Sequence, residues 1–185
     1  MHSNKSVPRH GGQQGFTLVE ALVVMIVGIV ILAAAAAGIG KLFRSSEIAT
    51  EAENITQMSA NLRNLKNGAN GYAGLKNSIA VQYKAVPATM TVSTTTQGDE
   101  TTSTIKNTWN GEVEIKAHGD SNQTYSIKYG DVPPEACQQL VLKLRNAGWS
   151  SLTAGSAEIT SATSLSAIGD ACKADKNILT FVSTS

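Results

Sequence analysis

The chain has 185 residues, a formal net charge of +1 and an aromatic content of 5%. This length allows one modest domain with appendages. The near-neutral charge gives no electrostatic reason to expect a specific nucleic-acid partner. Apolar residues are unevenly spread, which argues against a small soluble domain with a weak core.

The first 15 residues, MHSNKSVPRHGGQQG, are polar and directly precede a long apolar run. Between Ala21 and Gly40 there is no charged and no strongly polar side chain. About 20 such residues form a helix about 30 Å long, enough to cross the hydrocarbon core of a bilayer. An ordinary secretory signal is the alternative, with residues 33–38 as its small-residue cleavage site. The apolar run is too long for that, and Glu20 interrupts its beginning.

The junction between the polar leader and the apolar run carries a family resemblance. Gly15 is followed by the string FTLVE, which begins at Phe16 and ends at Glu20. This combination resembles the class III signal of type IV pilins, strongly over residues 1–45 and only in architecture beyond them. The resemblance implies that a prepilin peptidase cuts between Gly15 and Phe16 and methylates the new α-amine of Phe16.

Glu20 is the residue of this region with the clearest chemical consequence. An ionised carboxylate in hydrocarbon is costly and usually has a partner, but the apolar run offers no cation. Processing would create one, the α-amine of Phe16. The resemblance implies that Glu20 of one subunit pairs with the amine of its neighbour and so sets the axial register of a filament. The alternative is a carboxylate that reaches the membrane surface and has no role in assembly.

Gly28, Gly38 and Gly40 interrupt the helical pattern of the apolar run. Glycine costs about 1 kcal/mol relative to alanine inside a helix. Two interpretations are open: close packing of small residues between membrane helices, or local unwinding as the helix leaves lipid and enters a filament.

Helical periodicity continues beyond the apolar run. The residues at spacings of three and four are Ile48, Ala52, Ile55, Ser59, Leu62, Leu65 and Ala69. Charged residues, Glu51 and Glu53 among them, are expected on other faces. The sequence predicts one helix from Phe16 to near Asn67, ended by the glycine-rich residues 68–74.

The remaining chain is expected to add strands and a short helix. Residues 75–108 are predicted to be a long connection whose polar part, 93–104, is an exposed loop. The patterned segments are strands at 112–117, 124–129 and 178–182 and a helix at 135–146. A long helix followed by antiparallel strands indicates an α+β fold.

Two cysteines, Cys137 and Cys172, lie in the polar C-terminal region. Their spacing is unlike that of a zinc site, which needs closely spaced pairs. Outside the cytoplasm they are expected to form a disulfide, whereas in a reducing cytosol they would be free thiols. Both flanks of the apolar run carry two basic residues, so the positive-inside rule does not fix the orientation. The pilin resemblance places the C-terminal domain outside.

The sequence predicts no enzyme, cofactor or metal site. His118 is the only histidine beyond the leader, and neither a G-x-S-x-G motif nor a P-loop occurs. The aspartates are too scattered for a calcium loop. Trp109 and Trp149 are interpreted as core residues.

The resemblance implies a cleaved leader at 1–15, a transmembrane and assembly helix at 16–43, and a globular domain at 44–185 that includes the second half of the long helix. It implies the major subunit of a type IV pilus, closest to the type IVb branch, serving adhesion, aggregation or conjugative mating contact. A precursor in the bacterial inner membrane would become part of an extracellular filament. The expected partners are other pilin subunits, the prepilin peptidase and the pilus assembly machinery.

Three alternatives stay open at this point. The chain could be a minor pilin, a type II secretion pseudopilin, or a membrane-anchored periplasmic protein that does not polymerise. The long leader, large C-terminal domain and wide cysteine loop resemble the type IVb branch, whereas a first mature residue such as Phe16 is typical of type IVa pilins.

Overall fold

The computed structural model describes residues 17–184, and its internal contacts divide the chain into two compact units, Met1–Phe43 and Arg44–Ser185. The helix α1 spans Leu18–Arg63 and contributes to both units. It ends four residues before the predicted end at Asn67, and a 3₁₀ turn follows at Gly68–Asn70.

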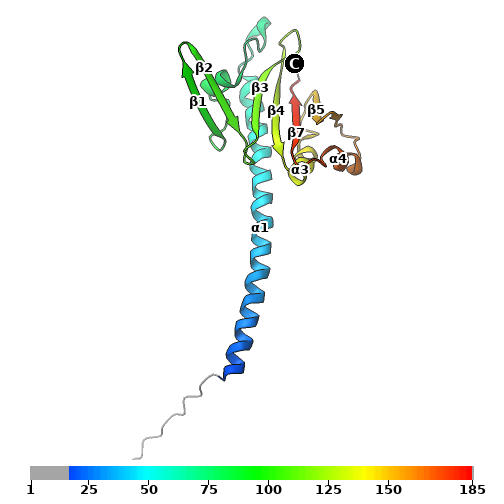
Figure 1. Ribbon diagram of the computed structural model, residues 1–185. Coiled ribbons are helices and arrows are strands. Elements are labelled where there is room, and N and C mark those ends of the chain that lie inside the picture. The colour runs from blue at the N-terminus through cyan, green and yellow to red at the C-terminus, as the bar shows by residue number, and fades with distance from the viewer. Residues whose placement is uncertain (1–16, 185) are drawn as a thin grey trace, which may run out of the picture. The chain divides into compact units, whose positions relative to one another are not determined.

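In the first unit, residues 18–43 of α1 carry the apolar run (Figure 1). By length and composition this is the one helix of the described residues that is apolar enough to cross a membrane, with a mean hydropathy of 2.9 in its most apolar stretch. No part of that stretch is buried within the chain.

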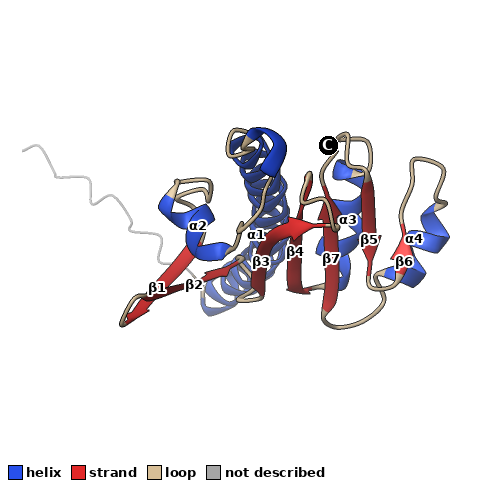
Figure 2. Ribbon diagram, turned by 90° about the horizontal axis from the view of Figure 1, so that it is seen from above, coloured by secondary structure: helices blue, strands red, loops and turns tan. Residues whose placement is uncertain are grey.

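The second unit contains a sheet in which every pair of neighbouring strands is antiparallel. The strands are β1 (Thr91–Gln97), β2 (Glu100–Lys106), β3 (Glu112–His118), β4 (Thr124–Val132), β5 (Ser151–Ala154), β6 (Ala157–Glu158) and β7 (Asn177–Val182). Their spatial order is β1-β2-β3-β4-β7-β5-β6, so β7 lies between β4 and β5 (Figure 2).

Three shorter helices accompany the sheet: α2 (Asn77–Gln82), α3 (Pro134–Leu144) and α4 (Leu165–Ala171). Residues 44–63 of α1 and the helix α3 lie on the same face of the sheet (Figure 2). The fully buried residues of the core include Ile55, Met58 and Leu62 from α1 and Tyr125 and Phe181 from the sheet. The α+β prediction is confirmed.

Several predicted elements are also confirmed. The strands expected at 112–117, 124–129 and 178–182 fall within β3, β4 and β7, and the helix expected at 135–146 corresponds to α3. Alternating burial in the strands and a one-sided apolar pattern in the helix make these elements readable from sequence.

The long connection predicted at residues 75–108 is wrong. This stretch contains α2 and the β1–β2 hairpin, and the predicted polar loop at 93–104 forms most of the hairpin. Threonine is β-branched and favours extended backbone, and its hydroxyl also forms cross-strand bonds such as Thr94 Oγ1 to Ser103 Oγ at 2.9 Å. A polar composition therefore concealed two regular strands.

Candidate assembly site

The N-terminal end of α1 is organised around Thr17 and Glu20. Thr17 precedes the first helical residue, and its Oγ1 accepts a hydrogen bond from the backbone N–H of Glu20 at 3.3 Å. This is half of a capping box, in which a threonine satisfies a free N–H of the first helical turn. The spacing Thr-x-x-Glu could have revealed this cap from the sequence alone.

The Glu20 carboxylate itself is exposed, and it has no hydrogen-bond or ion-pair partner among residues 17–184. An acidic side chain in the first turn of a helix interacts favourably with the helix dipole. Glu20 is thus held at a helix start while its charge stays available to another molecule. The predicted processing residues Gly15 and Phe16 lie outside the described residues.

The rest of residues 18–43 presents large apolar side chains outward. Leu18, Met25 and Leu32 are 82%, 72% and 70% exposed within the chain. A Cβ added at Gly28 or Gly40 would meet nothing within 4 Å, so no contact inside the chain requires glycine there. Gly38 also lies within α1. Within residues 17–184, neither the apolar surface nor Gly28 and Gly40 are explained by contacts inside the chain.

Within the second unit, the sequence-based placement of Glu51 on an exposed face of the helix is wrong. Glu51 is 2% exposed, and its carboxylate accepts three hydrogen bonds. The donors are the Thr108 backbone N–H at 2.7 Å, the Tyr129 hydroxyl at 3.1 Å and the Asn54 amide at 3.2 Å. Donors of this kind replace the water that a buried carboxylate loses.

The charge of Glu51 also affects Tyr129. Burial, and then the neighbouring Glu51 carboxylate, raise the pKa of Tyr129 well above its usual value. A second tyrosine supports the same helix, since the Tyr125 hydroxyl donates to the Ser59 carbonyl oxygen at 3.0 Å. Residues 44–63 of α1 are thus joined to β4 by two tyrosine hydroxyls as well as by apolar packing.

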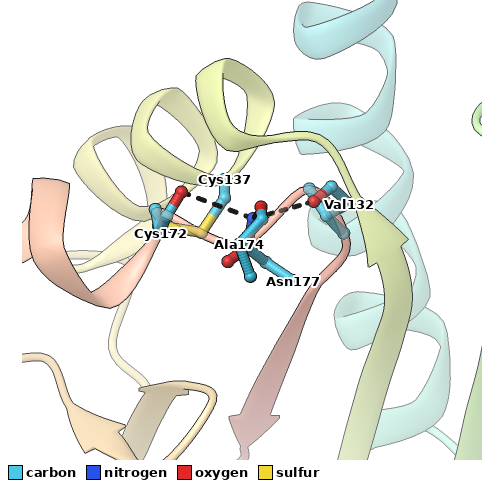
Figure 3. Close-up of a disulfide and its surroundings, with 5 residues drawn as sticks. All are labelled: Val132, Cys137, Cys172, Ala174 and Asn177. Carbon is cyan, nitrogen blue, oxygen red and sulfur yellow. Dashed lines mark hydrogen bonds between the residues drawn. A yellow bond between two sulfur atoms is a disulfide. The ribbon is translucent and has the colours of Figure 1, made fainter.

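The disulfide between Cys137 and Cys172 is present, and both residues are fully buried. As predicted, the two cysteines form a disulfide, which links α3 to the residue that ends α4 (Figure 3). The connection to the strand is made by Asn177, the first residue of β7. Its amide donates to the carbonyl oxygens of Val132 at 3.0 Å, Ala174 at 2.6 Å and Cys172 at 3.4 Å.

The other residues singled out from the sequence either pack against the core or lie on the surface. Trp109 and Trp149 are partly buried against the core, and the Trp149 ring centroid lies 5.2 Å from that of Phe181. His118 is exposed at the end of β3. Among residues 17–184 no group of three or more histidine, cysteine, aspartate or glutamate side chains is arranged to hold a metal ion.

A helix with a long apolar beginning, an α+β domain with a seven-stranded sheet and a C-terminal disulfide are the features that the resemblance to type IV pilins predicts. A family model described as PilS N terminal matches residues 45–184, and a model of the prokaryotic N-terminal methylation motif matches residues 11–36. The chain belongs to the PilS family of type IV pilins.

The structure is similar to the crystal structure of a type IVb pilin from Salmonella typhi, with a TM-score of 0.59 and 22% sequence identity. The match covers 74% of this chain and 99% of that pilin chain. No curated protein sequence matches the chain. This family and fold are those of structural subunits rather than enzymes.

Proposed function

We propose that the chain is the major structural subunit of a type IV pilus and that it polymerises through residues 16–43. The observation that carries this proposal is the uncovered apolar surface of the first part of α1, where side chains as large as Leu18 and Met25 are more than two-thirds exposed. Keeping apolar surface in contact with water costs about 25 cal/mol of free energy per Å². Two environments can cover it: lipid and the same helix of other subunits.

The two environments correspond to two stages. The precursor is held in the inner membrane by the apolar helix, with the leader in the cytoplasm and the globular domain outside. The prepilin peptidase then removes residues 1–15 and methylates Phe16, and the assembly machinery moves the subunit into a bundle of helices. The methylation motif matched at residues 11–36 supports this order, because it includes the Gly15–Phe16 junction.

Glu20 supplies the specific contact in this bundle. Its carboxylate pairs with the methylated α-amine of Phe16 in a neighbouring subunit, which reduces the desolvation cost of both charges. Gly28, Gly38 and Gly40 allow the helix to unwind locally as it passes from lipid to the filament. The extracellular filament then serves adhesion, aggregation or mating contact.

Electron microscopy of surface filaments, combined with mass spectrometry of the subunit's N-terminus, tests this proposal. The expected result is a filament made mainly of this chain, each copy beginning with N-methylated Phe16. Gly15→Val should leave uncut precursor in the membrane and abolish filaments, whereas Gly12→Val in the same leader should be processed normally. A mature chain that begins at Met1, or one cut near Ala36, would contradict the proposal.

The abundance of the chain in purified filaments separates the alternatives. A minor pilin or a pseudopilin would be present at a few copies or in no long surface filament. A membrane-anchored protein that does not polymerise would stay in the membrane fraction and would tolerate the loss of Glu20.

A further inference from the structure

The strand β1 is an uncovered edge of the sheet. It is the outermost strand on one side (Figures 1 and 2), and all seven of its residues, Thr91–Gln97, are exposed. The strand at the opposite edge, β6, has only two residues, Ala157–Glu158. Short edge strands are a common protection against pairing with another chain, and β1 lacks this protection.

The hairpin geometry shows which backbone groups of β1 are free. Gln97 pairs with Glu100 across a two-residue turn whose first residue, Gly98, has φ +61°. In such a tight hairpin the residues next to the turn form a hydrogen-bonded pair, and hydrogen-bonded pairs alternate along the strands. Val92, Thr94 and Thr96 therefore direct their N–H and C=O groups away from β2.

The outer part of the hairpin has little support from the rest of the sheet. Only Ile105 and Lys106 of β2 pair with β3, so the hairpin from Val92 to Thr104 is a two-stranded ribbon. The helix α2 packs against β2 and supports this ribbon from one face. The outer edge of β1 has no such neighbour among the described residues, so a further strand could be added there.

β1 also lacks the features that normally prevent edge pairing. Its sequence, TVSTTTQ, contains no charge and no proline, and its register with β2 runs without a bulge. Native edge strands usually carry lysine, proline or a bulge for this purpose.

We propose that β1 pairs antiparallel with β1 of a second copy of this chain, centred on Thr94. In this register Thr94 meets its own counterpart and Val92 meets Thr96 of the second copy. These are the residues with outward-facing backbone groups, so the pairing forms three hydrogen-bonded residue pairs and about six N–H···O bonds. The two hairpins become one four-stranded sheet.

The charges of β2 have opposite signs across the antiparallel arrangement and like signs across the parallel one. Lys106 lies opposite Thr91, and Glu100 lies opposite Gln97. Antiparallel pairing places Glu100 of one copy in the same row as Lys106 of the other, whereas in-register parallel pairing places Glu100 in the row of Glu100 and Lys106 in the row of Lys106. These charges are three strand spacings apart, about 14 Å, where salt screens most of their interaction, so their contribution to the choice is small.

The symmetry of this contact determines where it can occur, a step that rests on the proposed filament. Subunits within a helical filament repeat through two different surfaces, whereas a strand that pairs with itself is related by a two-fold axis. The β1 contact therefore joins subunits of two filaments. A single pair is weak, but many pairs along two adjacent filaments act together and hold them side by side.

Cysteine trapping tests the contact in the full chain. In the proposed register the two Thr94 Cα atoms are about 5.5 Å apart, a distance that suits a disulfide. Full-length Thr94→Cys in detergent micelles should accumulate a dimer that reductant removes, and Thr102→Cys on the neighbouring strand should not. The native cysteines are buried in their own bond and do not compete. A Thr94→Cys sample with no more dimer than Thr102→Cys overturns the proposal, as does trapping of a protein of different mass in cell envelopes.

Charge exchange at the same position tests the link between filaments. Thr94→Lys and Thr94→Glu each place like charges opposite one another, and each should reduce the fraction of laterally paired filaments several-fold by electron microscopy. Mixing Thr94→Lys filaments with Thr94→Glu filaments should restore pairing, and the same substitutions at Thr102 should have no effect. The proposal fails if the single variants still pair or if the mixture does not recover. Absence of filaments from the unsubstituted chain would instead contradict the proposed function, and the micelle assay would still report β1 pairing.

Discussion

The hydroxyl of Tyr129 donates a hydrogen bond to Oε2 of Glu51 at 3.1 Å, across 78 positions of the sequence. Tyr129 lies in β4 and Glu51 in the second half of α1. Both side chains are buried, so the bond forms away from water and fixes the helix against the sheet. The bond thus supports a buried carboxylate in a core that also contains the polar contacts of Tyr125 and Asn177.

Removing this hydroxyl should destabilise the globular domain. We expect Tyr129→Phe to lower the free energy of unfolding by about 1.5 to 3 kcal/mol, the usual value for a hydrogen bond to a charged group. Tyr83→Phe is the matched control, because Tyr83 is 62% exposed, and it should have little effect. Denaturant unfolding of the detergent-solubilised protein measures both. Equal stability of the two variants would show that the hydrogen bond from Tyr129 to Glu51 does not stabilise the folded domain.

Tyr129 should also determine part of the loss of stability at alkaline pH. The pKa of Tyr129 is raised in the folded protein by burial and by Glu51, while in the unfolded chain it is about 10. The stabilisation is therefore complete below pH of about 10 and is lost as the pH rises further, because only the unfolded state can ionise readily. Unfolding curves should show a steeper loss above that pH in the unsubstituted protein than in Tyr129→Phe. Tyr72, whose pKa burial also raises, should leave a residual slope in the variant.

Loss of the disulfide should cost more than either tyrosine bond. The bond joins residues separated by 35 positions, and closing such a loop contributes about 4 kcal/mol in the chain-entropy model. Cys137→Ser should therefore reduce the amount of folded subunit, as measured by protease resistance with and without reductant. The double variant Cys137→Ser/Cys172→Ser should be no worse, since neither thiol is then left unpaired. A reductant-insensitive unsubstituted protein would contradict this expectation.

Glu20→Ala should separate assembly from folding. The Glu20 side chain is exposed and has no bonding partner among residues 17–184, so its loss should leave processed subunit at normal levels in the membrane. Filaments should be few or absent, because in the proposed filament the amine of Phe16 would then have no partner at any subunit interface. Glu20→Asp should assemble partly, and Glu53→Ala, at an exposed position of the same helix, should assemble normally. Abundant filaments from Glu20→Ala cells would exclude the pairing mechanism.

The parts of this fold that could be predicted from sequence are those where the cause is local. The apolar run of residues 18–43 follows from composition, and α3 follows from its proline start and one-sided pattern. The β1–β2 hairpin was missed because its serines and threonines resemble a flexible loop unless β propensity is weighed. The burial of Glu51 was missed because its donors Thr108 and Tyr129 lie 57 and 78 positions away.

The position of β7 has a consequence for how the domain is made. Residues 177–182 form the last strand in the chain, yet they lie inside the sheet between β4 and β5. In the proposed export of this domain, β4 and β5 have no neighbour on their inner sides until this strand has crossed the membrane, and until then Asn177 cannot join the disulfide-linked helices to the strands. Contacts between such distant segments form slowly because the intervening chain must be ordered first. On that proposed route, export and folding are sequential, and a partly exported chain exposes open strand edges that invite aggregation.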